Sequence, residues 1–195
     1  LTRAGIKREE RAAILMLDSI DHVEVFWGCL KAGVIAVPIN TLLAGAVYDT
    51  ILSDSRASCL FVSAALLQVI KPVLAKNDHI RKVIVVGDHP LEDRFESYQT
   101  FTTGAPEQVP VAVSPDETAF WLYSSGSPCR PKRVRHVHSS LQATSDTYGA
   151  KILGLVQNDI VFSAAKLFFA YGLGNAMTFP MAGGAPPILV DGRAT

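Results

Sequence analysis

The chain has 195 residues, of which 49% are hydrophobic and 18% are charged, so it is long enough to form a domain with a sizeable core. Lysine plus arginine and aspartate plus glutamate number 18 each, and this balance argues against nucleic acid or an anionic membrane as a partner. The three cysteines show no CxxC spacing, which fits a reducing compartment and no metal site. We therefore expect a cytoplasmic protein.

Short β-type runs alternate with helical patterns along the whole chain. The predicted strands cover residues 12–17, 34–39, 59–62, 83–86, 119–123, 160–163 and 188–190. The predicted helices cover residues 22–31, 43–53, 65–76, 139–153 and 173–181, the fourth with an N-cap at Ser139 or Ser140. Nearly continuous apolar strands separated by helices predict an α/β fold, with layered, largely parallel sheets and helices on both faces.

Two segments do not follow this pattern. Residues 87–115 are polar, with Gly104, Pro106 and Pro110, and are predicted to connect two α/β layers. Residues 1–113 would then belong to a first α/β subdomain and residues 114–195 to a second. Residues 167–190 contain no charged side chain and are long enough to span a membrane. However, glycines and prolines interrupt them repeatedly, and lipid could not satisfy the freed backbone groups, so we expect a buried loop, helix and strand.

The segment most informative about function is 123–138, YSSGSPCRPKRVRHVH, which directly follows the apolar run 119–123. Backbone N–H groups and hydroxyls of a Ser/Gly loop after a strand can bind one anion, and a nearby lysine adds a positive charge. Such a loop suits the phosphates of a nucleotide, although neither the Walker pattern nor the dinucleotide fingerprint is present. The alternative is a plain surface turn, which Ser, Gly and Pro clusters usually form.

Two other interpretations of this segment carry less weight. Its basic residues could bind nucleic acid, but no aromatic residues are interleaved for base stacking. His136 and His138 would share one face of a strand, like a pair of metal ligands. A zinc site needs at least a third ligand, and none is visible in the sequence.

The loop resembles the signature of the adenylate-forming acyl-CoA synthetase superfamily, (Y/T)SSG(S/T)TGxPKGVxHTH. Two further motifs occur in the order typical of that family. Residues 25–40, VFWGCLKAGVIAVPIN, resemble its early helix and strand motif, and residues 162–175, FSAAKLFFAYGLGN, resemble its acyl-binding motif in the form found in benzoate-CoA ligases. The resemblance covers nearly the whole chain but less than half of the family's length.

The resemblance implies a two-step reaction that uses ATP, Mg²⁺ and coenzyme A. A small aromatic carboxylate attacks the α-phosphate of ATP, and the thiol of coenzyme A then captures the acyl-adenylate. The positions that match the phosphate-contacting loop are Ser124, Ser125, Gly126, Ser127 and Lys132. Those that match the acyl-binding wall are Phe169, Ala170, Tyr171 and Gly172, although such an uncharged run is also typical of a protein core.

The family's later motifs, including the catalytic lysine of the C-terminal lid, have no counterpart before Thr195, so we assign no catalytic residue. The chain is thus expected to be a fragment of the N-terminal domain of an aryl-CoA ligase and inactive alone. Alternatives are a non-catalytic module that binds aryl groups or nucleotides, and an anion or nucleic-acid binder. Pro128 and Cys129 stand where the family has Thr and Gly, Arg133 stands where it has Gly, and Arg135 stands where an apolar residue is usual. Arg133 is expected to fill space beside the nucleotide. Lys166 stands where many relatives have proline, and the sequence suggests no role for it.

Overall fold

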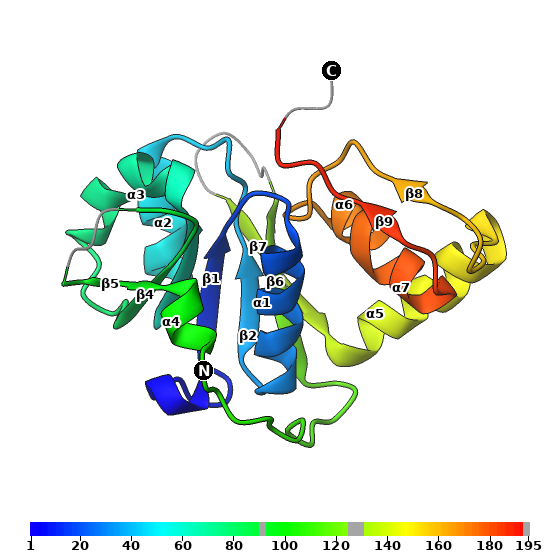
Figure 1. Cartoon of the computed structure of the whole chain (residues 1–195), viewed down its shortest axis with the longest axis horizontal. Helices are drawn as coiled ribbons and strands as arrows, with labels where there is room; N and C mark the ends of the chain where they lie inside the picture. The colour runs from blue at the N-terminus through cyan, green and yellow to red at the C-terminus, as the bar shows by residue number, and fades with distance from the viewer. Residues whose placement is uncertain (90–92, 125–130, 193–195) are drawn as a thin grey trace.

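The computed structural model describes residues 1–89, 93–124 and 131–192. These residues form a seven-stranded sheet with the strand order β5-β4-β3-β1-β2-β6-β7 (Figure 1). The strands are β1 (Arg11–Leu15), β2 (Ile35–Pro38), β3 (Cys59–Ser63), β4 (Lys82–Val86), β5 (Phe95–Ser97), β6 (Thr118–Ser124) and β7 (Lys132–Val137). All neighbouring strands are parallel except β6 and β7, which are antiparallel. The predicted fold class is confirmed.

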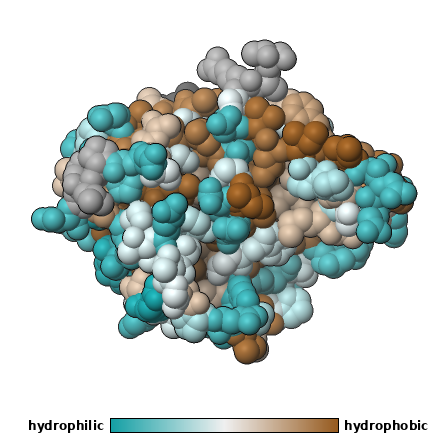
Figure 2. All heavy atoms as spheres, in the orientation of Figure 1, coloured by the Kyte–Doolittle hydropathy of each residue, from teal (hydrophilic) through white to brown (hydrophobic). Residues whose placement is uncertain are grey.

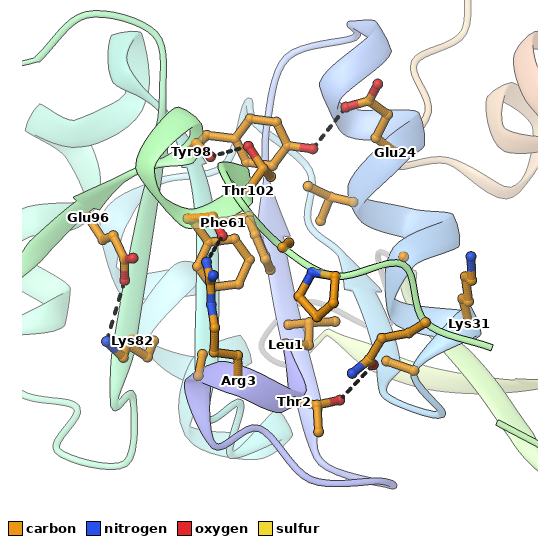
Figure 3. A pocket seen from close by; sticks show the side chains of 18 residues that line it. Leu1, Thr2, Arg3, Glu24, Lys31, Phe61, Lys82, Glu96, Tyr98 and Thr102 are labelled. Atoms are coloured by element: carbon orange, nitrogen blue, oxygen red, sulfur yellow. Dashed lines mark hydrogen bonds and ion pairs between the residues drawn. The ribbon is translucent and has the colours of Figure 1, made fainter. Parts of the chain in front are cut away.

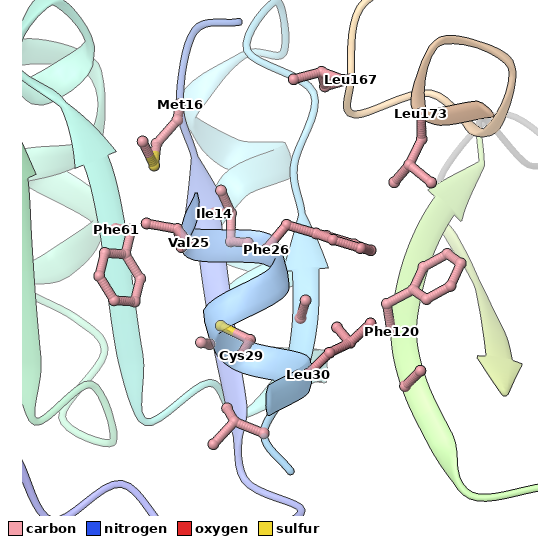
Figure 4. Packing of buried hydrophobic residues seen from close by; sticks show 14 of the residues in the cluster. Ile14, Met16, Val25, Phe26, Cys29, Leu30, Phe61, Phe120, Leu167 and Leu173 are labelled. Carbon is pink, nitrogen blue, oxygen red and sulfur yellow. The ribbon is translucent and has the colours of Figure 1, made fainter. Parts of the chain in front are cut away.

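Helices cover both faces of this sheet, because its central strands are apolar at almost every position and both of their faces must be buried. On one face, Ile14 of β1 packs with Val25, Phe26 and Cys29 of α1 (Ile20–Lys31), as Figure 4 shows. On the other face, Leu15 belongs to the cluster formed by α2 (Gly45–Ser55) and α3 (Leu67–Leu74). Alternate residues of one strand thus enter two separate cores. A single-turn helix, η2 (Ala64–Leu66), precedes α3, and another, η1 (Thr2–Ala4), lies at the start of the chain.

The local sequence explains where α1 begins and ends. The Ser19 side chain accepts a hydrogen bond from the His22 backbone N–H, at 3.3 Å, and caps the first turn. After Ala32 the chain reverses at Gly33, whose φ of 68° a residue with a Cβ rarely adopts. The chain then enters β2 directly.

The segment 87–115 differs from the prediction in two ways. It contains β5 and the short helix α4 (Tyr98–Thr102), so it is more than a connection. In addition, β6 pairs with β2 in the same sheet as the preceding strands, so the segment does not join two separate layers at this point. The division of the chain near residue 114 into two subdomain portions stays a prediction.

The C-terminal part lies beyond the β6–β7 end of the sheet (Figure 1). Helix α5 (His138–Thr144) continues into a π-helical stretch, η3 (Ser145–Leu153), and starts before either predicted N-cap. Ser140 instead accepts a hydrogen bond on its hydroxyl from the Val137 backbone N–H. A second continuous helical segment consists of α6 (Ala170–Leu173), the π-helical η4 (Gly174–Thr178) and α7 (Phe179–Gly183).

A small parallel pair of strands, β8 (Val161–Phe162) and β9 (Pro187–Ile188), completes this part. Apolar side chains are exposed over it, among them Ile160 (71%), Phe162 (54%) and Ile188 (48%), and Figure 2 shows hydrophobic atoms gathered there. Among the described residues, no helix combines the length and the apolar composition needed to span a membrane.

Candidate functional site

The predicted phosphate loop lies at the tip of the β6–β7 hairpin. Ser124 is the last residue of β6, Lys132 is the first of β7, and the two are partners in the strand register. The Ser124 hydroxyl donates to the Lys132 carbonyl oxygen at 3.4 Å, and both residues are exposed. The Ser124 and Lys132 side chains thus project from paired positions where the strands end. The other predicted loop residues, Ser125, Gly126 and Ser127, fall outside the described residues, as do Pro128 and Cys129, so the phosphate site stays a prediction.

Strand alternation divides the side chains of this hairpin between two faces. Phe120, Leu122 and Ser124 of β6 share a face with their partners His136, Val134 and Lys132 of β7. Trp121 and Tyr123 point to the opposite face, as do Arg135 and Arg133, with which they pair. Ser124 and Lys132 therefore share the face of Phe120 and His136.

The Arg133 side chain lies on the face of the hairpin opposite Lys132. Its guanidinium group lies 4.4 Å from the centre of the Trp121 ring and 3.4 Å from Oδ2 of Asp54 on α2. The same Asp54 oxygen accepts a hydrogen bond from the Tyr123 hydroxyl at 2.5 Å. Arg133 therefore lies across the sheet from Lys132 and does not fill space on the Ser124–Lys132 face.

A cavity of about 100 Å³ lies on that face, between the hairpin and the C-terminal helices. Its lining is mostly apolar and includes Phe120, Leu122, Leu141, Ala170, Leu173, Gly174 and Phe179, with His136, Ser140, Thr144 and Thr178 as polar members. The volume is of the order of the roughly 150 Å³ cavity that holds benzene in another protein. An apolar cavity with a few polar groups is typical of a small-molecule site.

His136 is the most polar group in this cavity. Its ring stacks on Phe120 with the centroids 4.5 Å apart and an interplanar angle of 2°. Burial lowers the pKa of His136, which favours the neutral imidazole. A neutral imidazole can donate one hydrogen bond and accept another. The sequence suggested a role for His136 as a metal ligand and not as part of an apolar cavity. A signal was present, because Phe120 and Leu122 alternate along β6, and a residue paired with Phe120 lies on the same apolar face.

The four residues predicted to form the acyl-binding wall do not all face the cavity. Ala170 lines the cavity, whereas Phe169 and Tyr171 are 46% and 66% exposed and are absent from its lining. Gly172 is buried, and a Cβ on it would clash with the carbonyl oxygens of Lys166 and Ala165. Only Ala170 of the four therefore faces this cavity, and the acyl-binding role of Phe169, Tyr171 and Gly172 stays a prediction.

The cavity wall instead follows the period of a helix. Ala170, Leu173 and Gly174 lie three and four positions apart and so share one helix face. The sequence prediction began this helix at Leu173, whereas α6 begins at Ala170. Gly174 is thus an interior position of the helical segment.

Lys166 has a structural role in this region. Its ammonium group donates to the carbonyl oxygens of Val190 and Gly192, each at 2.5 Å, and lies 4.0 Å from Oδ2 of Asp18. Asp18 is buried and accepts a hydrogen bond from the Leu167 backbone N–H at 3.2 Å. Burial raises the pKa of the Asp18 carboxyl group, while the Leu167 N–H and the Lys166 charge act against this shift. Lys166 thus joins the segment after β1, the turn before α6 and the segment after β9.

A cavity of about 360 Å³ lies elsewhere, between α1, α4 and the first residues of the chain (Figure 3). The Tyr98 hydroxyl donates to Glu24 at 2.9 Å, and Lys82 pairs with Glu96 at 3.4 Å, both at its wall. None of the described site residues lines this cavity, so its size does not bear on the predicted chemistry.

The pair His136 and His138 does not lie on one strand, because β7 ends at Val137 and His138 begins α5. Nowhere in the described ranges do three or more His, Cys, Asp or Glu side chains gather in a way that could hold a metal ion.

Comparison with known proteins shows the family of this chain. The family model described as "AMP-binding enzyme" matches residues 1–195. The chain belongs to the AMP-binding enzyme family. Among curated members of known activity, it is 42% identical to a 4-hydroxybenzoate–CoA/benzoate–CoA ligase of Rhodopseudomonas palustris over 195 residues, which cover all of this chain and 36% of that protein. It is 41% identical to a benzoate–CoA ligase of Thauera aromatica over 194 residues, again 100% and 36% of the two chains.

A solved structure of the AMP-binding family agrees with the fold. The anthranilate CoA ligase AuaEII, crystallised in complex with anthranoyl-AMP, superposes with a TM-score of 0.95 at 32% identity, over 99% of this chain and 37% of that one. The chain spans little more than a third of the length of these AMP-binding enzymes.

Proposed function

We propose that this chain is part of an ATP-dependent aryl-CoA ligase. In the proposed reaction the carboxylate of benzoate or a similar aromatic acid attacks the α-phosphorus of ATP and displaces pyrophosphate. The thiol of coenzyme A then attacks the acyl carbon and displaces AMP. The curated relatives that are 41–42% identical over the whole chain carry names that specify benzoate.

The observation that carries the proposal is that two kinds of binding group share one face of the β6–β7 hairpin. Ser124 and Lys132, suited to phosphate, lie at its tip, and the apolar cavity with Phe120 and His136 lies further along the same face. An aromatic acid that reacts with ATP needs an apolar ring site next to an anion site, with its carboxylate between them. Holding the two reactants in this order supplies much of the catalysis in such a transfer.

The chain's residues would take the following roles. The Ser124 hydroxyl and the Lys132 ammonium group would contact the phosphates of ATP together with Ser125, Gly126 and Ser127. Phe169, Ala170, Tyr171 and Gly172 are proposed to form the acyl-binding segment, in which Ala170 supplies the side chain that faces the cavity.

Magnesium would reach the site with the nucleotide. Mg²⁺ would be held by the phosphates, by water and by one or two carboxylates, as is usual for this ion. It would neutralise charge on the phosphates. Coenzyme A is the proposed second substrate.

The test is an assay of the enzyme encoded by the reading frame that contains this chain. Release of AMP should depend on benzoate, ATP and coenzyme A together, and acetate or a long-chain fatty acid should support far less of it. A preference for a long-chain acid would contradict the aryl assignment and leave family membership intact. The alternative of a non-catalytic binding module predicts no AMP release with any acid, and the ligase names of the relatives give it no support.

A further inference from the structure

Asp54 on α2 contacts both strands of the hairpin that carries the predicted phosphate site. Its Oδ2 atom accepts the Tyr123 hydroxyl at 2.5 Å and lies 3.4 Å from the Arg133 guanidinium group. Tyr123 immediately precedes Ser124, and Arg133 immediately follows Lys132. The Asp54 carboxylate thus connects α2 to the residue beside each predicted phosphate ligand. Asp54 lies 69 residues before Tyr123 in the sequence.

The surroundings make this contact more than a flexible surface pair. The Arg133 guanidinium group also stacks over Trp121 at 4.4 Å, and the Arg11 guanidinium carbon lies 5.7 Å from the same ring. Trp121 and Tyr123 pack against the core cluster of α2 and α3. Arg133 is therefore held between an aromatic face and a carboxylate, which restricts its motion more than either contact alone.

The contact lies opposite the predicted phosphate ligands. Because side chains alternate along β6 and β7, Tyr123 and Arg133 point to the α2 face while Ser124 and Lys132 point to the other. Asp54 therefore lies on the side away from a ligand bound by Ser124 and Lys132. Apart from the Coulomb effect of its charge, it would act by fixing the backbone from which these two side chains project.

We propose that Asp54 is a positioning residue for the phosphate-binding pair Ser124 and Lys132, acting through Tyr123 and Arg133. This proposal rests on the proposed function, in which that pair contacts the phosphates of ATP. Positioning residues of this kind raise affinity by holding ligand-binding groups in the productive geometry before the ligand arrives.

The charge of Asp54 makes the sign of its effect informative. The Asp54 carboxylate lies beside the hairpin and repels an anion, so Coulomb interactions alone predict tighter pyrophosphate binding after Asp54→Asn. Positioning predicts weaker binding after the same change. Tyr123→Phe removes one hydrogen bond without any change of charge, so it tests the same contact with no electrostatic contribution.

The experiment titrates inorganic pyrophosphate into the 195-residue chain by calorimetry at fixed ionic strength, with urea unfolding to verify that each variant is folded. Asp54→Asn and Tyr123→Phe should each weaken binding by roughly fivefold, the size of a moderate coupling between contacting residues. Asp49→Asn is the matched control, because Asp49 also lies on α2 and accepts a hydrogen bond, from Asn77 at 2.9 Å, in contacts away from the hairpin. It should bind pyrophosphate like the unaltered chain, and Lys132→Met should lose binding.

Hydrogen exchange of peptides covering β6 and β7 provides the second measurement. These amides should exchange faster in Asp54→Asn than in Asp49→Asn. If the unaltered chain binds pyrophosphate and Asp54→Asn binds it equally or more tightly, the positioning role is wrong and the proposed function stands. If the unaltered chain binds no pyrophosphate while exchange responds to Asp54→Asn, the phosphate site itself is wrong, and Asp54 only stabilises the hairpin.

Discussion

Gly172 offers the sharpest test of how the segment after the turn at residues 165–166 is built. The sequence favoured an acyl-binding role for this glycine, whereas the structure shows it buried against that turn. A Cβ at position 172 would clash with the Lys166 carbonyl oxygen and lie 2.5 Å from the Ala165 carbonyl oxygen. We predict that Gly172→Ala destabilises the chain strongly.

The size of the effect follows from what would have to move. The clashing atoms belong to the backbone, so no side-chain rotation can relieve the contact. The turn is also held in place, by the Lys166 ammonium on Val190 and Gly192 and by the Leu167 N–H on Asp18. Overpacking of this kind costs about 1–3 kcal/mol, occasionally more. The higher helix propensity of alanine offsets about 0.5–1 kcal/mol, so a net loss of about 1–2 kcal/mol is expected.

Gly28→Ala is the matched control, because Gly28 lies inside α1 and a Cβ there would meet no atom within 4 Å. It should raise the free energy of unfolding by about 0.5–1 kcal/mol. Urea unfolding followed by circular dichroism would measure both variants, with the m-value as a check on the denatured state. If Gly172→Ala proved as stable as Gly28→Ala, the close approach of the turn would not be a constraint, and an acyl-binding role for Gly172 would regain weight.

Three further predictions concern pH, the hairpin and the cavity. Burial lowers the pKa of His22 from its ordinary value of 6.5 to about 4. Between these two values the unfolded chain binds a proton at His22 and the folded chain does not, so acid favours unfolding. The free energy of unfolding should therefore fall by up to about 3 kcal/mol as the pH drops from 6.5 to 4. Urea unfolding at several pH values should show a shallower fall in His22→Gln. Arg133→Gly should lower the free energy of unfolding by about 1–2 kcal/mol through loss of the Trp121 and Asp54 contacts, and an unchanged value would contradict the bracing role. Ala170→Phe in the complete enzyme should depress benzoate-dependent AMP release far more than acetate-dependent release, because the larger ring enters the cavity; equal effects on both acids would argue against an aryl site there.

The sequence predicted the central strands well because they are buried on both faces. Strands such as β1 and β3 appear in the sequence as uninterrupted apolar runs, a signal that local polarity does not obscure. The two strands that it missed, β5 and β7, are the two edges of the sheet. Edge strands of natural proteins are short or charged, which discourages pairing with other chains. β5 has three residues, and β7 reads KRVRHV, so neither shows the apolar alternation of a strand.

The start of α6 was missed for a different reason. Gly172 and Gly174 lower the helix propensity of the segment, so local preference favours a turn. Packing overrides this preference, since Gly172 fits against the turn at 165–166 and Gly174 against the Phe179 ring, where larger side chains would clash. The residues that face the cavity could be predicted only after the helix was known to begin at Ala170.

The positions of the loop departures bear on whether the hairpin has kept its proposed role. Two of the unusual residues named above, Arg133 and Arg135, share the face of Trp121. Lys132, which matches the family pattern, lies on the face of the cavity, as does His136. Arg133 contacts Asp54 and Trp121 on the side opposite Lys132. The side chains at positions 133 and 135 thus leave the face of Lys132 and His136 uncovered, and the sign of the Asp54→Asn effect on pyrophosphate binding is the most direct test of whether the opposite face supports a phosphate site.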